Sequence, residues 1–226
     1  MIDFDKLISD YLKRDRKPKT IGRYYPSECG SCLRKAYYSY LIPTDIDDDL
    51  LKIFHVGDLL HTFIKDVFSS DKSKAVVELV DAEKPFTIEQ EGYLIAGRID
   101  DLLLLKTNGE QVLVEVKSTA YLSSSPEPSL SHILQLQLYL HATNIPKGIL
   151  LYLEKNTLKT QHFTIPYDVA LVQKALHRFK LLHNSLTTNT IPDPEARLFH
   201  TMRWMCGRCS YREQCYKQNP ATPELP

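Results

Sequence analysis

The sequence predicts an α/β sandwich in which helices cover a mixed β-sheet. Three observations support this class: helical periodicity near the start of the chain, a run of strand-like segments in its middle, and a helix–strand–strand–helix order after that run. Helices and sheets each have an apolar face that must be buried, and this order lets them bury it against one another. With 226 residues, of which 43% are apolar, the chain suits a single domain spanning residues 1–226.

The N-terminal third is expected to be mostly helical. Residues 1–16 are typical of a short amphipathic helix, and without an uninterrupted apolar region they do not resemble a signal peptide. Prolines and glycines interrupt residues 17–31, which predicts a loop. A tyrosine-rich helix is expected over residues 32–41, and apolar residues at helical spacing predict a long helix over residues 50–68.

Strand-like composition dominates the middle of the chain. Strands are expected over residues 75–80, 86–89, 93–105 and 112–117. Asn108-Gly109 predicts a tight turn that joins the last two strands into a hairpin.

The C-terminal half alternates between the two kinds of element. After a Ser/Pro-rich loop, a helix is expected over residues 130–143, followed by strands over 148–153 and 160–165. Pro166 is expected to open a helix that runs to about residue 186. The tail from Thr187 is polar and contains prolines and cysteines.

Charge and hydropathy favour a cytoplasmic protein with locally sorted charges. No apolar run approaches the roughly 20 residues of a membrane helix, so no membrane association is expected. The net charge is zero, which excludes long-range steering of nucleic acid by the whole chain. One segment is nevertheless basic, and it is either a solvated face or a phosphate-binding path. Its residues are Lys13, Arg14, Arg16, Lys17, Lys19 and Arg23.

An acidic and lysine constellation is the first candidate site. Glu115 and Lys117 share one face of a predicted strand, because successive side chains in a strand alternate between faces. Across the hairpin, Asp100 is expected to lie near Glu115, whereas Asp101 points to the other face. Two carboxylates suit Mg²⁺ or Mn²⁺, and a neighbouring lysine can hold or deprotonate an attacking water. The alternative is a cross-strand ion pair on a solvated sheet face.

Three further side chains fit the same site. His61 lies on the long predicted helix, and a neutral imidazole is a suitable third ligand for Mn²⁺. Gln135 and Tyr139 are four residues apart on one helix face. Gln135 can hydrogen-bond the lysine, a water or a phosphate, and Tyr139 can stack on a base. Taken alone, His61 is more often a packed or surface histidine, and Gln135 with Tyr139 is an ordinary pair on an amphipathic helix.

The five cysteines form a second constellation. An odd number without a secretory signal argues against a disulfide framework and favours a metal site. Cys206, Cys209 and Cys215 lie close together in the tail, so a fourth ligand must be Cys29 or Cys32. Three tail cysteines and one distant one suit a [4Fe–4S] cluster, whereas a structural zinc would pair Cys29 and Cys32 with Cys206 and Cys209 and leave Cys215 free. The spacing alone does not distinguish the two.

Taken in order, these motifs resemble the RecB-like PD-(D/E)XK nucleases, and within them the CRISPR-associated family four nucleases. The resemblance runs from about residue 25 to residue 215. No single motif is specific, but the ordered set is. The motifs are Cys32 with the basic, tyrosine-rich segment after it, Gly57 to His61, Gly97 to Asp100, Glu115 to Lys117, Gln135 to Tyr139, and Cys206, Cys209 and Cys215.

The resemblance implies a restriction-endonuclease-like fold and a [4Fe–4S] cluster. It favours Cys32 as the fourth ligand beside Cys206, Cys209 and Cys215, in a module built from about residues 24–41 and 200–218. It also implies dependence on Mn²⁺ or Mg²⁺ and 5′-to-3′ degradation of single-stranded DNA, with endonuclease activity in some members. Family members work beside the integrase that captures CRISPR spacers.

The resulting hypothesis assigns a role to each residue. His61, Asp100, Glu115 and the backbone carbonyl of Val116 are expected to hold the divalent metal, and Lys117 to assist the water. Gln135 and Tyr139 are expected to position the strand. The alternatives are a RecB-like repair or recombination nuclease, and a non-catalytic DNA-binding adaptor with a zinc staple. The oligomeric state is not predicted.

Overall fold

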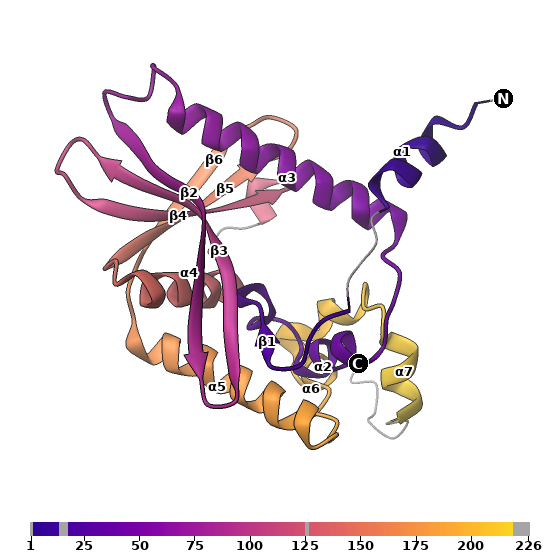
Figure 1. The fold of residues 1–226 in the computed structure, drawn as a ribbon. Helices are drawn as coiled ribbons and strands as arrows, with labels where there is room; N and C mark the ends of the chain where they lie inside the picture. The colour runs from indigo at the N-terminus through magenta and orange to yellow at the C-terminus, as the bar shows by residue number, and fades with distance from the viewer. Residues whose placement is uncertain (1, 14–17, 125–126, 219–226) are drawn as a thin grey trace.

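A computed structural model of the chain describes residues 2–13, 18–124 and 127–218. Arg14, Arg16 and Lys17 of the basic segment lie outside the described residues. Six strands form one mixed sheet in the order β1-β3-β4-β5-β6, with β2 also paired to β3. The long helix α3 crosses one face of the sheet, and α4 covers the other with α5 beneath it (Figure 1). The predicted α/β sandwich with a mixed sheet is therefore confirmed.

The strands agree with the sequence pattern except at β1, which lies in a segment expected as a loop, and at β2. The two strands expected over residues 75–80 and 86–89 are one long strand, β2, which begins at Val77. It pairs only with β3, and such an edge strand tolerates Pro85, which has no N–H to donate. The strands are β1 (Arg23–Tyr24), β2 (Val77–Gln90), β3 (Tyr93–Leu105), β4 (Gln111–Thr119), β5 (Lys147–Glu154) and β6 (Thr160–Pro166).

The helices correct two expectations. The first helix ends at Leu12 and not at residue 16. Pro166 ends β6 and does not open a helix, because the Asp168 carboxylate accepts the Ala170 and Leu171 N–H groups and caps α5. The tail contains further short helices. The helices are α1 (Phe4–Leu12), α2 (Leu33–Leu41), α3 (Asp48–Ser69), α4 (Leu130–Thr143), α5 (Val169–Thr187), α6 (Glu195–Leu198) and α7 (Arg212–Gln218), with 3₁₀ turns η1 (Pro26–Glu28), η2 (Leu122–Ser124) and η3 (His200–Cys206).

Apolar packing fixes α3 and α4 over the sheet. Leu60 and Ile64 of α3 pack with Val114 and Val116, and burial of each such side chain contributes about 1.5–3 kcal/mol. On the opposite face, Leu136 of α4 belongs to a cluster with strand residues. His61 follows Leu60 directly, so this packing also fixes its place beside the sheet. No helix in the described ranges is long and apolar enough to cross a membrane.

Arg178 of α5 joins the N-terminal and C-terminal segments. Its guanidinium donates to both carboxylate oxygens of Glu195, at 2.9 and 2.8 Å, and to the backbone oxygens of Cys29 and Ser31, at 2.6 and 2.9 Å. Glu195 in turn accepts the Leu33 N–H at 2.8 Å, which satisfies a free donor at the start of α2. Segments far apart in the sequence, α2 and α6, therefore lie side by side (Figure 1).

Replacing this arginine should destabilise the whole domain. Arg178→Met leaves Glu195 and two backbone oxygens without their donor, and we expect a loss of about 3 kcal/mol in the free energy of unfolding, measured with urea. Lys147→Met is the matched control, because the exposed Lys147–Glu110 pair at 2.6 Å should contribute less than about 1 kcal/mol. Equal, small losses in both variants would contradict this account.

Candidate active site and cysteine cluster

Asp100 and Glu115 meet where β3 and β4 separate. The ladder between these strands ends at the pair Asp101 and Val114, and β4 then continues beside β5 alone. In place of a backbone carbonyl, the Asp100 carboxylate accepts the Val116 N–H at 3.0 Å. This bond holds one carboxylate beside the strand that carries the other.

Glu115 is the centre of a buried polar network. Its side chain is 1% exposed, and its Oε1 accepts from Lys117 Nζ at 2.6 Å and from Gln135 Nε2 at 2.8 Å. Gln135 also accepts from Lys117 at 3.1 Å and donates to the Tyr139 hydroxyl at 2.6 Å. The second oxygen, Oε2, is buried and has no hydrogen-bond partner among the described residues. An unpartnered buried carboxylate oxygen is costly, which makes it a candidate ligand atom.

The electrostatics of the two carboxylates favour a cation between them. Burial raises the pKa of Asp100 to about 6, and burial together with Asp100 raises the pKa of Glu115 to about 7. Burial opposes the charge on Lys117, but Glu115 outweighs it and raises the lysine pKa, so the ammonium stays charged. Two crowded carboxylates compensated by one lysine are a suitable environment for a divalent ion.

His61 completes the donor set from α3. Its Nδ1 lies 3.4 Å from Asp100 Oδ2. Burial lowers the pKa of the imidazole, and the neutral form is the one that binds metals. In the described parts of the chain, no three His, Cys, Asp or Glu side chains are grouped closely enough to hold a metal ion as they stand. The donor types nevertheless fit a hard divalent cation, as does the Glu115 oxygen that no described residue hydrogen-bonds.

A cavity of about 470 Å³ opens over this network. Some of the residues that line it were not predicted from the sequence as part of the site. Asp101 pairs with Val114 and lies on the opposite face from Glu115, as expected, yet it also lines this cavity. Lys65, four residues after His61 on α3, could have been found from helical spacing. Glu83 could not, because it reaches the cavity from an irregular part of β2 with a positive φ of 55°.

The structure corrects the role expected for Tyr139. Its ring is buried and packs edge-on against Phe86, with centroids 5.1 Å apart, so neither face is available to a DNA base. The hydroxyl instead accepts from Gln135, which holds Lys117 and Glu115. Base stacking by Tyr139 was therefore wrong, and the geometry places it behind the network as a support.

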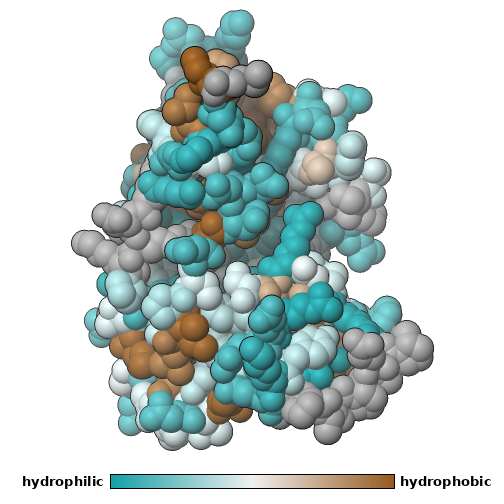
Figure 2. Space-filling model, turned by 90° about the vertical axis from the view of Figure 1, so that its right-hand side faces the viewer, coloured by the Kyte–Doolittle hydropathy of each residue, from teal (hydrophilic) through white to brown (hydrophobic). Residues whose placement is uncertain are grey.

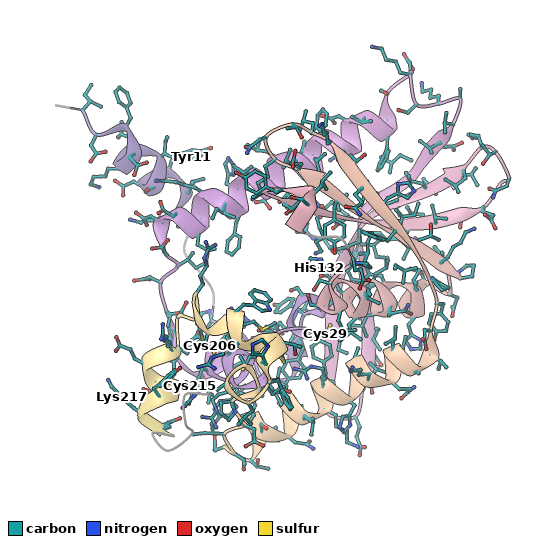
Figure 3. All side chains as sticks on the ribbon, turned by 180° about the vertical axis from the view of Figure 1, so that it is seen from behind. Tyr11, Cys29, His132, Cys206, Cys215 and Lys217 are labelled. Carbon is teal, nitrogen blue, oxygen red and sulfur yellow. The ribbon has the colours of Figure 1, made fainter. Side chains whose placement is uncertain are left out.

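Four of the five cysteines line a second cavity. Cys32, at the start of α2, lies there with Cys206, Cys209 and Cys215 of the tail. Cys29 belongs to the apolar core, is 2% exposed, and burial raises the pKa of its thiol to about 12. Figure 3 shows Cys206 and Cys215 close together, with Cys29 farther towards the interior of the molecule.

The four thiols are near enough to influence one another. Burial, followed by the neighbouring thiols, raises the pKa of Cys206 and of Cys209, because neighbouring thiolates repel. Arg34 Nη1 lies 3.8 Å from Cys215 Sγ and provides one compensating charge. Among the described residues these thiols are not grouped closely enough to hold a metal ion as they stand, but their chemistry suits a thiophilic metal centre, which would neutralise the repulsion.

Comparison with known proteins shows that the chain is similar to nucleases. Residues 68–216, about two thirds of its length, match the PD-(D/E)XK nuclease superfamily. The match includes Asp100, Glu115 and Lys117 and begins after His61. The chain is also 24% identical to the CRISPR-associated exonuclease Cas4 of Saccharolobus solfataricus over 212 residues, which cover 93% of this chain and 94% of that protein.

Two solved structures share the fold. The crystal structure of SSO0001 aligns with a TM-score of 0.58 and 20% identity, covering 96% of this chain and 94% of that one. The structure of LHK-Exo in complex with dAMP, an alkaline exonuclease from Laribacter hongkongensis, aligns with a TM-score of 0.50 and 12% identity, covering 75% of this chain and 90% of that one. These alignments confirm the restriction-endonuclease-like sheet flanked by helices.

Proposed function

The chain belongs to the PD-(D/E)XK nuclease superfamily, and on this premise we propose that it is a metal-dependent deoxyribonuclease that degrades single-stranded DNA. The observation that carries the proposal is Oε2 of buried Glu115, which lies near Asp100 and His61 and has no hydrogen-bond partner in the part of the chain that the structure describes. These three side chains, with the backbone carbonyl of Val116, are the residues that would hold Mn²⁺ or Mg²⁺. A bound ion of this kind supplies polarisation of the phosphate and a water of lowered pKa.

The chain's own residues supply the rest of the chemistry. Lys117 is held by Glu115 and Gln135, so its ammonium is preorganised to stabilise negative charge on a phosphate and to orient the attacking water. Gln135 keeps the lysine and the carboxylate in register and is itself held by Tyr139. The open cavity beside them can admit a DNA backbone.

The four-cysteine cavity supports a [4Fe–4S] cluster with a structural role. We infer that Cys32, Cys206, Cys209 and Cys215 are its ligands, because they line one cavity. The cluster would tie residues 24–41 to residues 200–218, which already meet where Arg34 Nη1 lies 3.8 Å from Cys215 Sγ. A zinc ion bound by the same thiols is the competing outcome of the test described in the Discussion.

The biological setting follows from the relative and not from the site. Similarity over nearly the whole chain to an exonuclease named Cas4 supports a role in CRISPR spacer acquisition, with the integrase as partner. The fine specificity, 5′-to-3′ polarity with additional endonuclease activity, is part of the same proposal. A cytoplasmic location accords with this role.

The substrate and polarity can be tested with labelled DNA. Single-stranded oligonucleotides labelled at the 5′ or the 3′ end should be degraded in the presence of Mn²⁺, with the 5′ label released first as a short product. Double-stranded DNA of the same sequence should react more slowly, because duplex ends must open to enter the site. Cleavage of closed circular single strands would reveal the endonuclease component. Release of the 3′ label first would contradict the proposed polarity.

A further inference from the structure

The chain's only tryptophan, Trp204, is 73% exposed on the 3₁₀ turn η3. A 3₁₀ helix has three residues per turn, so Thr201, Trp204 and Gly207 share one edge, and all three are exposed. The residues one turn before and after the indole are small, which leaves room beside its ring. Phe199, directly before η3, is also 56% exposed.

The segment around Trp204 is strongly basic in a chain of zero net charge. Between residues 197 and 217 the one acidic residue is Glu213. Arg208 and Arg212 are exposed, whereas Arg197 lies over the Tyr216 ring at 4.0 Å and donates to the Cys215 carbonyl. The basic residues of this segment are Arg197, Arg203, Arg208, Arg212 and Lys217.

The Trp204 indole neither packs in the core nor lines one of the two cavities described above, so neither explains its position. Trp204 lines neither the four-cysteine cavity nor the one above Glu115. Charge compensation of the thiols explains some of the arginines, but it does not require an exposed aromatic ring. The C-terminal segment lies on the side of the molecule that also carries α1 (Figure 1), and Figure 2 shows this side hollowed at mid-height below α1.

We propose that Trp204 is a stacking platform for a base of single-stranded DNA, outside the catalytic cavity. The proposal rests on the proposed function, since it assumes that a DNA strand is the substrate. Exposed aromatic rings interleaved with cations bind single strands because the ring stacks on any base while the cations contact the phosphates. The positive charges of Arg203, Arg208 and Arg212 favour a polyanion as the ligand over a neutral or basic protein surface.

A fluorescence titration tests the platform directly, because all tryptophan emission comes from Trp204. The full-length, anaerobically purified protein is titrated with oligothymidylate of about 20 nucleotides in EDTA, so that the strand is bound and not cut. Stacking should quench the emission in proportion to binding. A trinucleotide, which is too short to extend beyond the catalytic cavity, should cause little quenching.

Variants separate stacking from a general loss of structure. Trp204→Leu should raise Kd and KM for the long oligonucleotide about tenfold, the effect of one lost stack, with kcat unchanged. Trp204→Phe, which keeps a ring, should recover part of the affinity. Tyr11→Leu is the matched control, since Tyr11 is 79% exposed on α1 and should leave Kd unchanged.

The possible failures are distinguishable. If the wild type cleaves DNA but its emission does not respond, or if Trp204→Leu keeps the wild-type KM, the platform is overturned and the exposed ring is better explained by a protein partner. If the wild type neither binds nor cleaves single-stranded DNA, the proposed function fails as well.

Discussion

Asp100→Asn is expected to lower the rate of DNA cleavage by about 10³-fold or more, because a metal-centred site contributes several kcal/mol to the transition state. The substitution keeps the size of the side chain and its hydrogen bond from the Val116 N–H, so the fold should survive. Glu115→Gln should have an effect of the same order. The rate is measured with end-labelled single-stranded DNA in Mn²⁺.

A binding measurement separates a chemical role from a structural one. Mn²⁺ should raise the Tm of the wild type, since a ligand that binds only the folded state stabilises it, and this rise should be much smaller in Asp100→Asn. Urea unfolding without metal should be similar for both proteins. Asp101→Asn is the neighbouring control, and its effect on cleavage should be below about tenfold, because no hydrogen bond links Asp101 to Glu115 or Lys117 among the described residues. Equal losses in Asp100→Asn and Asp101→Asn would overturn the assignment.

Replacing any one of the four cavity cysteines is expected to remove the cluster completely. Protein purified without oxygen should be brown, with broad absorbance near ~400 nm from thiolate-to-iron charge transfer at a four-cysteine site. Cys32→Ser, Cys206→Ser, Cys209→Ser and Cys215→Ser should each be colourless and poorly soluble, because the two ends of the chain lose their link.

Cys29→Ser provides the control within the same segment. Its thiol lies in the apolar core and outside the four-cysteine cavity, so this variant should stay brown. It should lose some stability, because a hydroxyl replaces a buried thiol. A colourless wild type that contains one zinc would replace the iron–sulfur cluster with a zinc site. A Cys29→Ser variant that bleaches while Cys32→Ser does not would show that the fourth ligand is wrong.

Elements with strong local signals could be predicted from the sequence. The helix over residues 130–143 and the strand over residues 93–105 were predicted with the bounds that the structure has, because apolar periodicity decides both. The hairpin turn at Asn108-Gly109 is also confirmed, with Gly109 at a positive φ of 71°. In contrast, β1 is two residues long and depends on pairing with a strand distant in the sequence, which local composition does not reveal.

Some features of the candidate site could likewise be predicted from the sequence, and others could not. The proximity of Asp100 and Glu115 followed from strand alternation and the hairpin. The burial of Tyr139 against Phe86 did not, because it depends on how closely α4 approaches the sheet. The separation of Cys29 from the other four cysteines likewise depends on tertiary packing, since Cys29 and Cys32 are only three residues apart.

The central claim is that the cavity above Glu115 is a metal-dependent centre for cutting DNA, and one assay tests it most directly. Anaerobically purified wild type and Asp100→Asn are each incubated with end-labelled single-stranded DNA in EDTA, and Mn²⁺ is then added in excess. The account predicts no product from either protein in EDTA, rapid degradation by the wild type once Mn²⁺ is added, and almost none by Asp100→Asn. Degradation that proceeds in EDTA, or that is equal for both proteins in Mn²⁺, would contradict it, and a wild type that binds DNA without cutting it would identify the protein as an adaptor.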